Sequence, residues 1–220
     1  MLNAQFKRFC ENHAMRLRTT TPLQRMQAWG MLAIALWLPG LGAALKHSML
    51  THVGVQVSLL VVAGYGLGHA FLAHHPKHHQ TARRYRGALM LVAVFTLMVW
   101  MVPRLLDLAV DLPEVDLLKA LSLVFFAGVP LAWAWPHLPA VAQGVLHLEA
   151  LATLWRLGWL YLDSPSRLCL RYGLEDQHNL GRGLMVAGVI YALWLAYLAL
   201  RGQVKPMAAA HVHKPLARMP

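Results

Sequence analysis

Histidine gives this chain its clearest chemistry, because thirteen of its 220 residues are histidines. Imidazole binds transition metals and haem iron, and it is costly to leave unpaired inside a membrane. His47, His52 and His178 fall at the ends of apolar stretches that short loops can bring together, and Met49 lies between two of them. Imidazole and thioether ligands together suit copper, above all Cu(I). We therefore expect a copper site; the alternative is that these histidines are interfacial polar residues at helix ends.

A second set of ionisable residues lies near the middle of a later apolar stretch. It contains His147 and Glu149, and Arg156 follows seven residues after Glu149. Seven residues are about two helical turns, so Glu149 and Arg156 share a face and can form an internal ion pair. His147 lies on another face and is a candidate ligand for a metal or a haem iron. Ionisable groups inside membranes are usually functional, so we count His147 and Glu149 as candidate metal-site residues; the alternative is a polar lock between helices.

Membrane-spanning helices must position these residues. The chain is 58% hydrophobic and 13% charged, whereas a soluble domain carries about 25% charged residues. Six apolar stretches are long enough to cross a bilayer. They cover residues 28–45, 51–73, 87–106, 117–135, 138–162 and 183–200. The sequence therefore predicts an all-α, polytopic membrane bundle of six transmembrane helices.

The distribution of charge predicts how this bundle is oriented. Lys and Arg gather in the arm at residues 1–27, in the loop at 74–86 and in the tail at 201–220, whereas the loop after the third stretch is mostly acidic. Basic segments of membrane proteins stay on the cytoplasmic side. We expect both termini in the cytoplasm of a bacterium, with residues 28–200 forming the bundle in its inner membrane. The net charge of +11 then reports orientation and contact with the lipid bilayer, and we expect no nucleic-acid partner.

Two further patterns concern packing and surface. Gly64 and Gly68 form a GxxxG pair in the second stretch, which predicts close helix contact and a central place in the bundle. The loop that follows reads HHPKHH at residues 74–79. Histidine tracts can capture transition metals, but the flanking Lys and Arg repel cations. The alternative is a basic loop that touches lipid headgroups.

One segment also carries a family resemblance. The segment LEDQHNLGRGLM at residues 174–185 resembles the acidic-Gln-Gly-Met signature that opens a late span in the CtaG-type cytochrome c oxidase assembly factors, which are polytopic membrane proteins. The segment LTHVGVQ at residues 50–56 is similar to the histidine-containing helix of that family. The resemblance implies copper insertion into a haem-copper oxidase, with motif-matched positions at His52, Asp176, Gln177 and Met185.

Together these patterns predict a copper-binding membrane protein that assists oxidase assembly and hands metal to an oxidase subunit. We expect no enzymatic turnover, because the chain contains no nucleotide-binding or hydrolase motif. Two alternatives stay open. One is a b-type cytochrome in which His147 pairs with His52 or His69 on a haem. The other is a non-catalytic membrane subunit of a larger complex.

Overall fold

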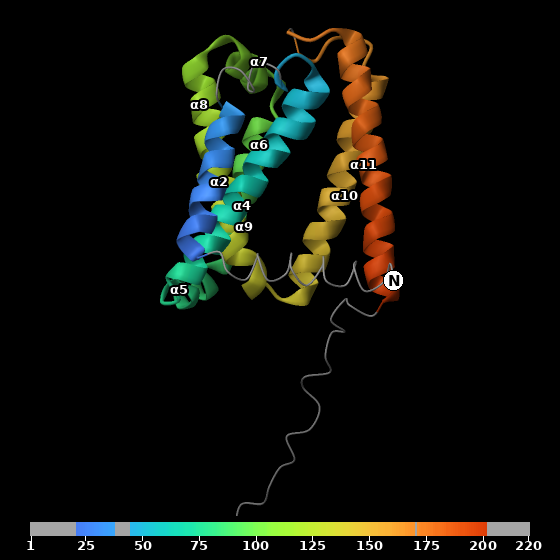
Figure 1. The fold of residues 1–220 in the computed structure, drawn as a ribbon. Coiled ribbons are helices and arrows are strands. Elements are labelled where there is room, and N and C mark those ends of the chain that lie inside the picture. Colours follow the sequence, from blue (N-terminus) through green and yellow to red (C-terminus); the bar gives the residue numbers. More distant parts are fainter. Residues whose placement is uncertain (1–20, 38–44, 170, 202–220) are drawn as a thin grey trace, which may run out of the picture.

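The computed structural model describes residues 21–37, 45–169 and 171–201, and over these residues the chain is helical without a strand (Figure 1). The elements are α2 (Pro22–Trp37), the π-helix η1 (Leu50–Gln56), α4 (Val57–His74), α5 (His78–Arg84), α6 (Arg86–Trp100), α7 (Pro103–Asp111), α8 (Pro113–Ser122), the π-helix η2 (Leu123–Gly128), α9 (Val129–Ala134), the 3₁₀ turn η3 (Trp135–His137), α10 (Ala140–Asp163) and α11 (Leu174–Leu200). The predicted all-α class is confirmed for this part of the chain. Most of the predicted N-terminal arm and nearly all of the tail lie outside it.

Three continuous helices are long and apolar enough to cross a membrane: Leu50–His74, Pro113–His137 and Leu174–Leu200. A fourth span exists among the described residues if α6 and α7 are one broken span. These helices correspond to predicted spans 2, 4 and 6, and they fit a protein that lives in a lipid environment. Predicted span 1 overlaps α2, but its last part lies outside the described residues.

The third predicted span, at residues 87–106, is not one continuous helix. The helix α6 ends at Trp100, and α7 turns away from it by 72°. Pro103 begins α7, and Val102 before it is extended, with φ −72° and ψ 119°. Proline disfavours the helical conformation for the residue that precedes it, which accounts for the break in the helix here. Fifteen residues give α6 a length of about 22 Å.

The helix α4 lies at the centre of the larger part of the bundle, packed against α2, η2 and α9. A Cβ atom on Gly64 would overlap the backbone of Val124 and crowd Gly128, and one on Gly68 would lie 3.0 Å from the Cα of Val129. The close contact that the GxxxG spacing predicts is therefore confirmed. Pro130 follows η2 and donates no amide hydrogen bond to the preceding turn, which accounts for the widened helix at this crossing.

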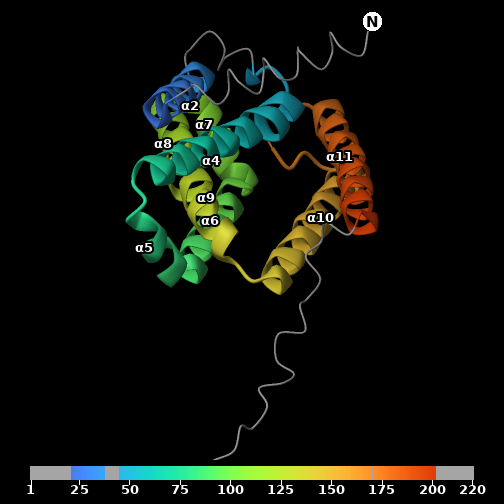
Figure 2. The ribbon, with the colours of Figure 1, turned by 60° about the horizontal axis from the view of Figure 1, so that its bottom comes forward.

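The helices α10 and α11 form an antiparallel hairpin beside this bundle (Figure 2). The hairpin contacts η1 near the start of α11, where Leu180 approaches Gly54 and Leu50 lies against Gly183. Elsewhere most of its surface is outward-facing, and only 6% of the α11 span is buried. The α10 helix is long enough to span a bilayer, but its polar residues keep it outside the apolar set.

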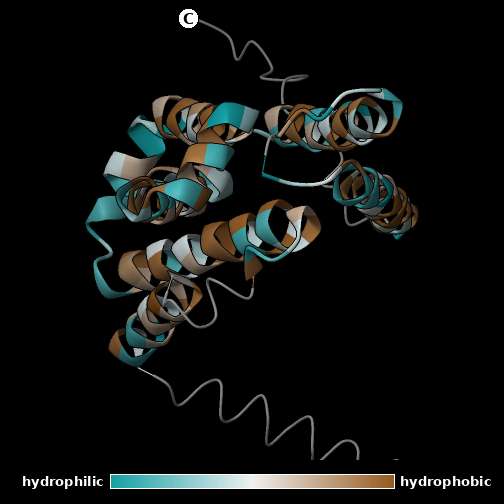
Figure 3. Ribbon diagram, turned by 90° about the horizontal axis from the view of Figure 1, so that it is seen from above, coloured by the Kyte–Doolittle hydropathy of each residue, from teal (hydrophilic) through white to brown (hydrophobic). Residues whose placement is uncertain are grey.

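Many large apolar side chains are exposed on the outside of the molecule, and Figure 3 shows from above how hydrophobic and hydrophilic residues are distributed along the helices. Leu91 and Phe95 on α6 are 72% and 69% exposed, and Leu193 on α11 is 66% exposed. A water-soluble protein rarely exposes contiguous apolar surface on this scale. The pattern fits helices whose outer faces meet lipid.

Candidate functional site

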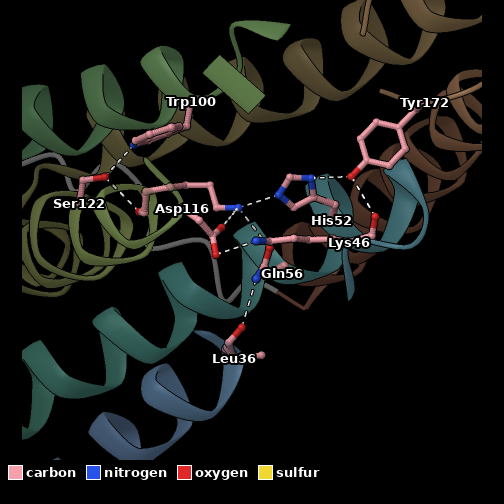
Figure 4. Close-up of polar contacts among 9 residues, drawn as sticks. Leu36, Lys46, His52, Gln56, Trp100, Asp116, Ser122 and Tyr172 are labelled. Atoms are coloured by element: carbon pink, nitrogen blue, oxygen red, sulfur yellow. Dashed lines mark hydrogen bonds and ion pairs between the residues drawn. The ribbon is translucent and has the colours of Figure 1, made fainter. Parts of the chain in front are cut away.

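Six buried or half-buried polar side chains meet at one end of the bundle (Figure 4). We call them the buried cluster; its members are Lys46, His52, Gln56, Asp116, Lys119 and Tyr172. The helix η1 contributes two of them, α8 contributes two, and the segments before η1 and α11 contribute one each. His52 and Lys119 are 0% exposed and Asp116 is 4% exposed. Charged groups so far from water require partners, and the members of the cluster partner one another.

The ammonium group of Lys119 is the centre of the buried cluster. Its Nζ lies 2.6 Å from Nε2 of His52, and it donates to Oε1 of Gln56 at 3.2 Å. It also forms an ion pair with Oδ1 of Asp116 at 2.9 Å, one turn earlier on the same helix. Three neighbours thus match the three donors of a lysine ammonium.

The role of His52 follows from that of Lys119. An ammonium only donates, so Nε2 of His52 accepts and the ring proton sits on Nδ1. The Nδ1 atom then donates to Oη of Tyr172 at 2.9 Å, and Tyr172 donates to the backbone carbonyl of Lys46 at 3.1 Å. Burial raises the pKa of the Tyr172 phenol, which keeps its donating proton in place. Both ring nitrogens of His52 are therefore used by protein groups.

The cluster contains two ammonium groups and one carboxylate. Lys46 Nζ lies 2.8 Å from Oδ2 of Asp116, on the side opposite Lys119, and the Lys46 side chain is 21% exposed. With neutral His52, the cluster carries a formal charge of about +1. This positive charge repels an added metal cation, so the buried cluster is a poor site for a metal ion.

Neighbouring helices hold the cluster in place. Gln56 donates from Nε2 to the carbonyl of Leu36 on α2 at 3.1 Å. Trp100 on α6 donates to Oγ of Ser122 at 2.7 Å, and Ser122 donates to the carbonyl of Lys119 at 3.0 Å (Figure 4). These bonds tie α2, η1, α6 and α8 together. The arrangement is therefore a polar lock between helices, in which every member of the cluster has at least one hydrogen-bond or ion-pair partner.

The other candidates near η1 and the start of α11 do not surround a common point. Met49 is fully buried in an apolar cluster with Val53 and Leu106. His47 is exposed and His178 is partly exposed. Over the described residues, no group of three or more His, Cys, Asp or Glu side chains is arranged to hold a metal ion. Copper binding stays a prediction, and a site that uses His52 requires the buried cluster to open.

The residues of the family-like segment have structural contacts at the start of α11. Gln177 is buried; its Oε1 accepts from the amide of Leu168 at 2.9 Å, and its Nε2 donates to the carbonyl of Tyr161 at 3.3 Å. Asp176 is half-buried, and the half-buried Met185 packs near Gly158 on α10. Gln177 therefore fixes the loop between α10 and α11.

This loop also holds the one cysteine among the described residues. Cys169 is 2% exposed and unpaired, and burial raises the pKa of its thiol to about 11. On its other side the loop is attached to α7 by an ion pair between Arg171 and Asp111. The loop is thus fixed to both parts of the molecule.

The ionisable residues of α10 occupy two different environments. His147 Nδ1 lies 2.6 Å from Oη of Tyr191 on α11, with the Trp135 ring 5.0 Å away between centroids. The predicted ion pair is present, with Nη1 of Arg156 2.9 Å from Oε1 of Glu149. The side chains of this pair are 68% and 51% exposed, so the pair is external, and the expectation of an internal pair is wrong.

Sequence reasoning missed most of the buried cluster. It placed Asp116 in the loop before a span that begins at 117 and counted Lys119 with the charges of that loop, whereas the helix begins at Pro113 and includes both. Their spacing of three residues, at the start of an apolar run, is the sequence signal that could have indicated a shared helical face. Lys46 and Tyr172 come from distant segments, and no sequence pattern connects them to α8.

Comparison of the chain with protein-family models, with curated proteins and with solved structures finds no match. The resemblance to the oxidase assembly factors therefore stays a prediction.

Proposed function

We propose that this chain is a multi-pass membrane protein that assists assembly of a haem-copper oxidase by docking to an oxidase subunit through α10. The observation that carries the docking role is the exposed ion pair between Glu149 and Arg156. The oxidase as partner is supported by the resemblance at residues 50–56 and 174–185. The role is that of a non-catalytic assembly subunit.

The depth of the ion pair supports this proposal. The indole of Trp155 is in close contact with Gly188, which lies at the middle of the 27-residue helix α11. Glu149 and Arg156 lie on either side of the middle of the 24-residue helix α10, about 10 Å apart along its axis. In a bilayer, both side chains are at the depth of the acyl chains.

A lipid-facing ion pair at this depth is unfavourable. Ionisable residues within spans almost always face protein or a water-filled cavity, because hydrocarbon does not solvate charge. Glu149 and Arg156 contact each other through one hydrogen bond, and Oε1 of Glu149 also accepts from Thr153 at 3.5 Å, so other donors of the guanidinium and the second carboxylate oxygen are left for a partner. A partner helix with polar groups supplies that pairing and covers the low-hydropathy face of α10.

The same proposal includes the orientation and location predicted from the sequence. We place six spans in a bacterial inner membrane, with both termini in the cytoplasm. In support, α5 with its arginines and the acidic start of α8 lie at opposite ends of the molecule (Figure 1). The positive-inside rule puts the α5 end in the cytoplasm and the buried cluster near the outer face.

The test replaces both charges with leucine, in the variant Glu149→Leu/Arg156→Leu. If the pair meets lipid, leucine suits that face better and both folding and oxidase assembly are kept. Under the docking proposal, the purified variant keeps its thermal stability, but oxidase haem and copper content falls to the level of a deletion strain. The matched control is Phe95→Leu/Met98→Leu on the exposed face of α6, which should leave assembly unchanged.

Copper handling is a second proposal for the outer end. It is supported by the exposed His47 just before η1 and the partly exposed His178 near the start of α11, because η1 and α11 are in contact. A replacement of both histidines should reduce copper per purified chain, while His52→Phe alone should leave it unchanged if His52 stays locked. Both ring nitrogens of His52 have protein partners, so His52 has no free nitrogen to bind a haem iron together with His147.

A further inference from the structure

The short helix α5 carries a concentrated positive charge at one end of the bundle. It connects α4 to α6 and lies at the end opposite α7 (Figure 1). The helix packs against α9; Ala82 is fully buried, whereas the other residues of the helix are exposed. Lys77, Arg83, Arg84 and Arg86 are all exposed. We call these four residues the basic patch.

No carboxylate neutralises the basic patch within the described part of the chain. The sequence contains no Asp or Glu between residues 12 and 106. Arg86 donates to the backbone carbonyl of His137 at 2.9 Å, and the guanidinium of Arg84 lies 5.7 Å from the Tyr85 ring centroid. Neither contact cancels a charge. The patch therefore presents about four positive charges, together with the exposed imidazoles at residues 74, 75, 78 and 79.

Aromatic side chains fix the depth of the patch. Phe71 and Trp133 stack with their ring centroids 5.6 Å apart, near the last turn of the span that ends at His74. Trp133 donates to the carbonyl of Gly68 at 3.1 Å, and His78 of α5 stacks on its ring. Aromatic rings of this kind gather at the level of lipid headgroups. The patch thus lies at the height of the phosphates.

We propose that the basic patch binds the headgroups of anionic phospholipids in the leaflet on the α5 side. Four cations without carboxylate partners, held at phosphate height on an outward-facing helix, are complementary to that surface. The proposal rests on the membrane placement of the chain and is independent of docking through α10.

The test measures phospholipid binding to the purified full chain in non-ionic detergent by native mass spectrometry. The probes are phosphatidylglycerol and phosphatidylcholine with identical acyl chains. The wild type should prefer phosphatidylglycerol, and Arg83→Gln/Arg84→Gln should weaken that binding by about 25-fold, at about fivefold for each cation removed. The charge-keeping variant Arg83→Lys/Arg84→Lys should keep it, which separates loss of charge from loss of folding.

The matched control removes the same charge from the other end, in Arg104→Gln/Arg167→Gln, where both arginines are exposed. That variant should bind phosphatidylglycerol like the wild type. Equal binding of the two lipids, or an equal loss in the control, overturns the proposal. So does full competition by millimolar inorganic phosphate, because the patch would then bind free phosphate rather than a lipid.

Discussion

Replacing Lys119 by methionine removes the central cation of the buried cluster while keeping a side chain of similar length. The ammonium has three partners, namely His52 Nε2 at 2.6 Å, Gln56 Oε1 at 3.2 Å and Asp116 Oδ1 at 2.9 Å. The variant leaves two buried acceptors without a donor. It also leaves Asp116 with Lys46 as its one cationic partner in the cluster.

The expected loss follows from these contacts. Removing one partner of a buried ion pair costs about 3–5 kcal/mol, and each unsatisfied buried acceptor costs about 1–3 kcal/mol. These two free-energy costs describe partly the same loss, so they are not summed. The carboxylate of Asp116 also keeps its ion pair with Lys46. We expect Lys119→Met to lower the free energy of unfolding by about 3 kcal/mol. At about 2–4 °C per kcal/mol for a chain of this size, Tm should fall by about 6–12 °C.

The assay is thermal unfolding of the purified protein in a mild detergent, followed by the loss of the monodisperse species. Arg104→Met is the control, because this arginine is exposed at the same end of the molecule. Adding Asp116→Asn to Lys119→Met should not restore the Tm, because Lys46 then loses the carboxylate that pairs with it. A Tm for Lys119→Met within about 1 °C of the wild type, or an equal fall for Arg104→Met, would refute the reasoning.

Three other predictions follow from the packing and from the loop. Gly64→Ala forces a Cβ atom into a neighbouring backbone and should lower the free energy of unfolding by about 1–3 kcal/mol, as measured by thermal unfolding. In the control Gly144→Ala the added Cβ atom meets no atom within 4 Å, so this variant should be neutral, and equal effects of the two variants contradict the close crossing. In a Cys10→Ser background, native Cys169 should react with maleimide at pH 8 at least about 100-fold more slowly than after denaturation, because its raised pKa lowers the thiolate fraction; fast native labelling contradicts this. Tyr172→Phe removes the hydroxyl that bridges an imidazole and a carbonyl and should cost about 1–3 kcal/mol, so an unchanged Tm contradicts that bridge.

Hydropathy and spacing predicted the features that depend on neighbouring residues in the chain. The second and fourth apolar stretches are continuous helices, and Gly64 makes the close crossing that its spacing indicates. Glu149 and Arg156 pair as their separation of two turns predicts. The spacing did not predict whether the face of α10 that carries this pair is buried or exposed, because that depends on where the other helices pack.

The buried cluster shows the same limit more strongly. His52 looked like a ligand because an imidazole at a helix end has a free nitrogen in isolation. Its two nitrogens are used by Lys119 and Tyr172, which lie 67 and 120 residues further along the chain. Contacts at such separations depend on tertiary packing, and a single sequence does not encode them in any local period.

The most direct test of the proposed function places a photo-crosslinking amino acid at Leu148, which is 66% exposed and adjacent to Glu149 on α10. The control position is Leu91 on α6, which is 72% exposed. After irradiation of native membranes, we expect a crosslink to a haem-copper oxidase subunit from position 148 alone, and its loss in the Glu149→Leu/Arg156→Leu background. Crosslinks from position 148 to lipid only, or the same oxidase adduct from both positions, would contradict docking through α10.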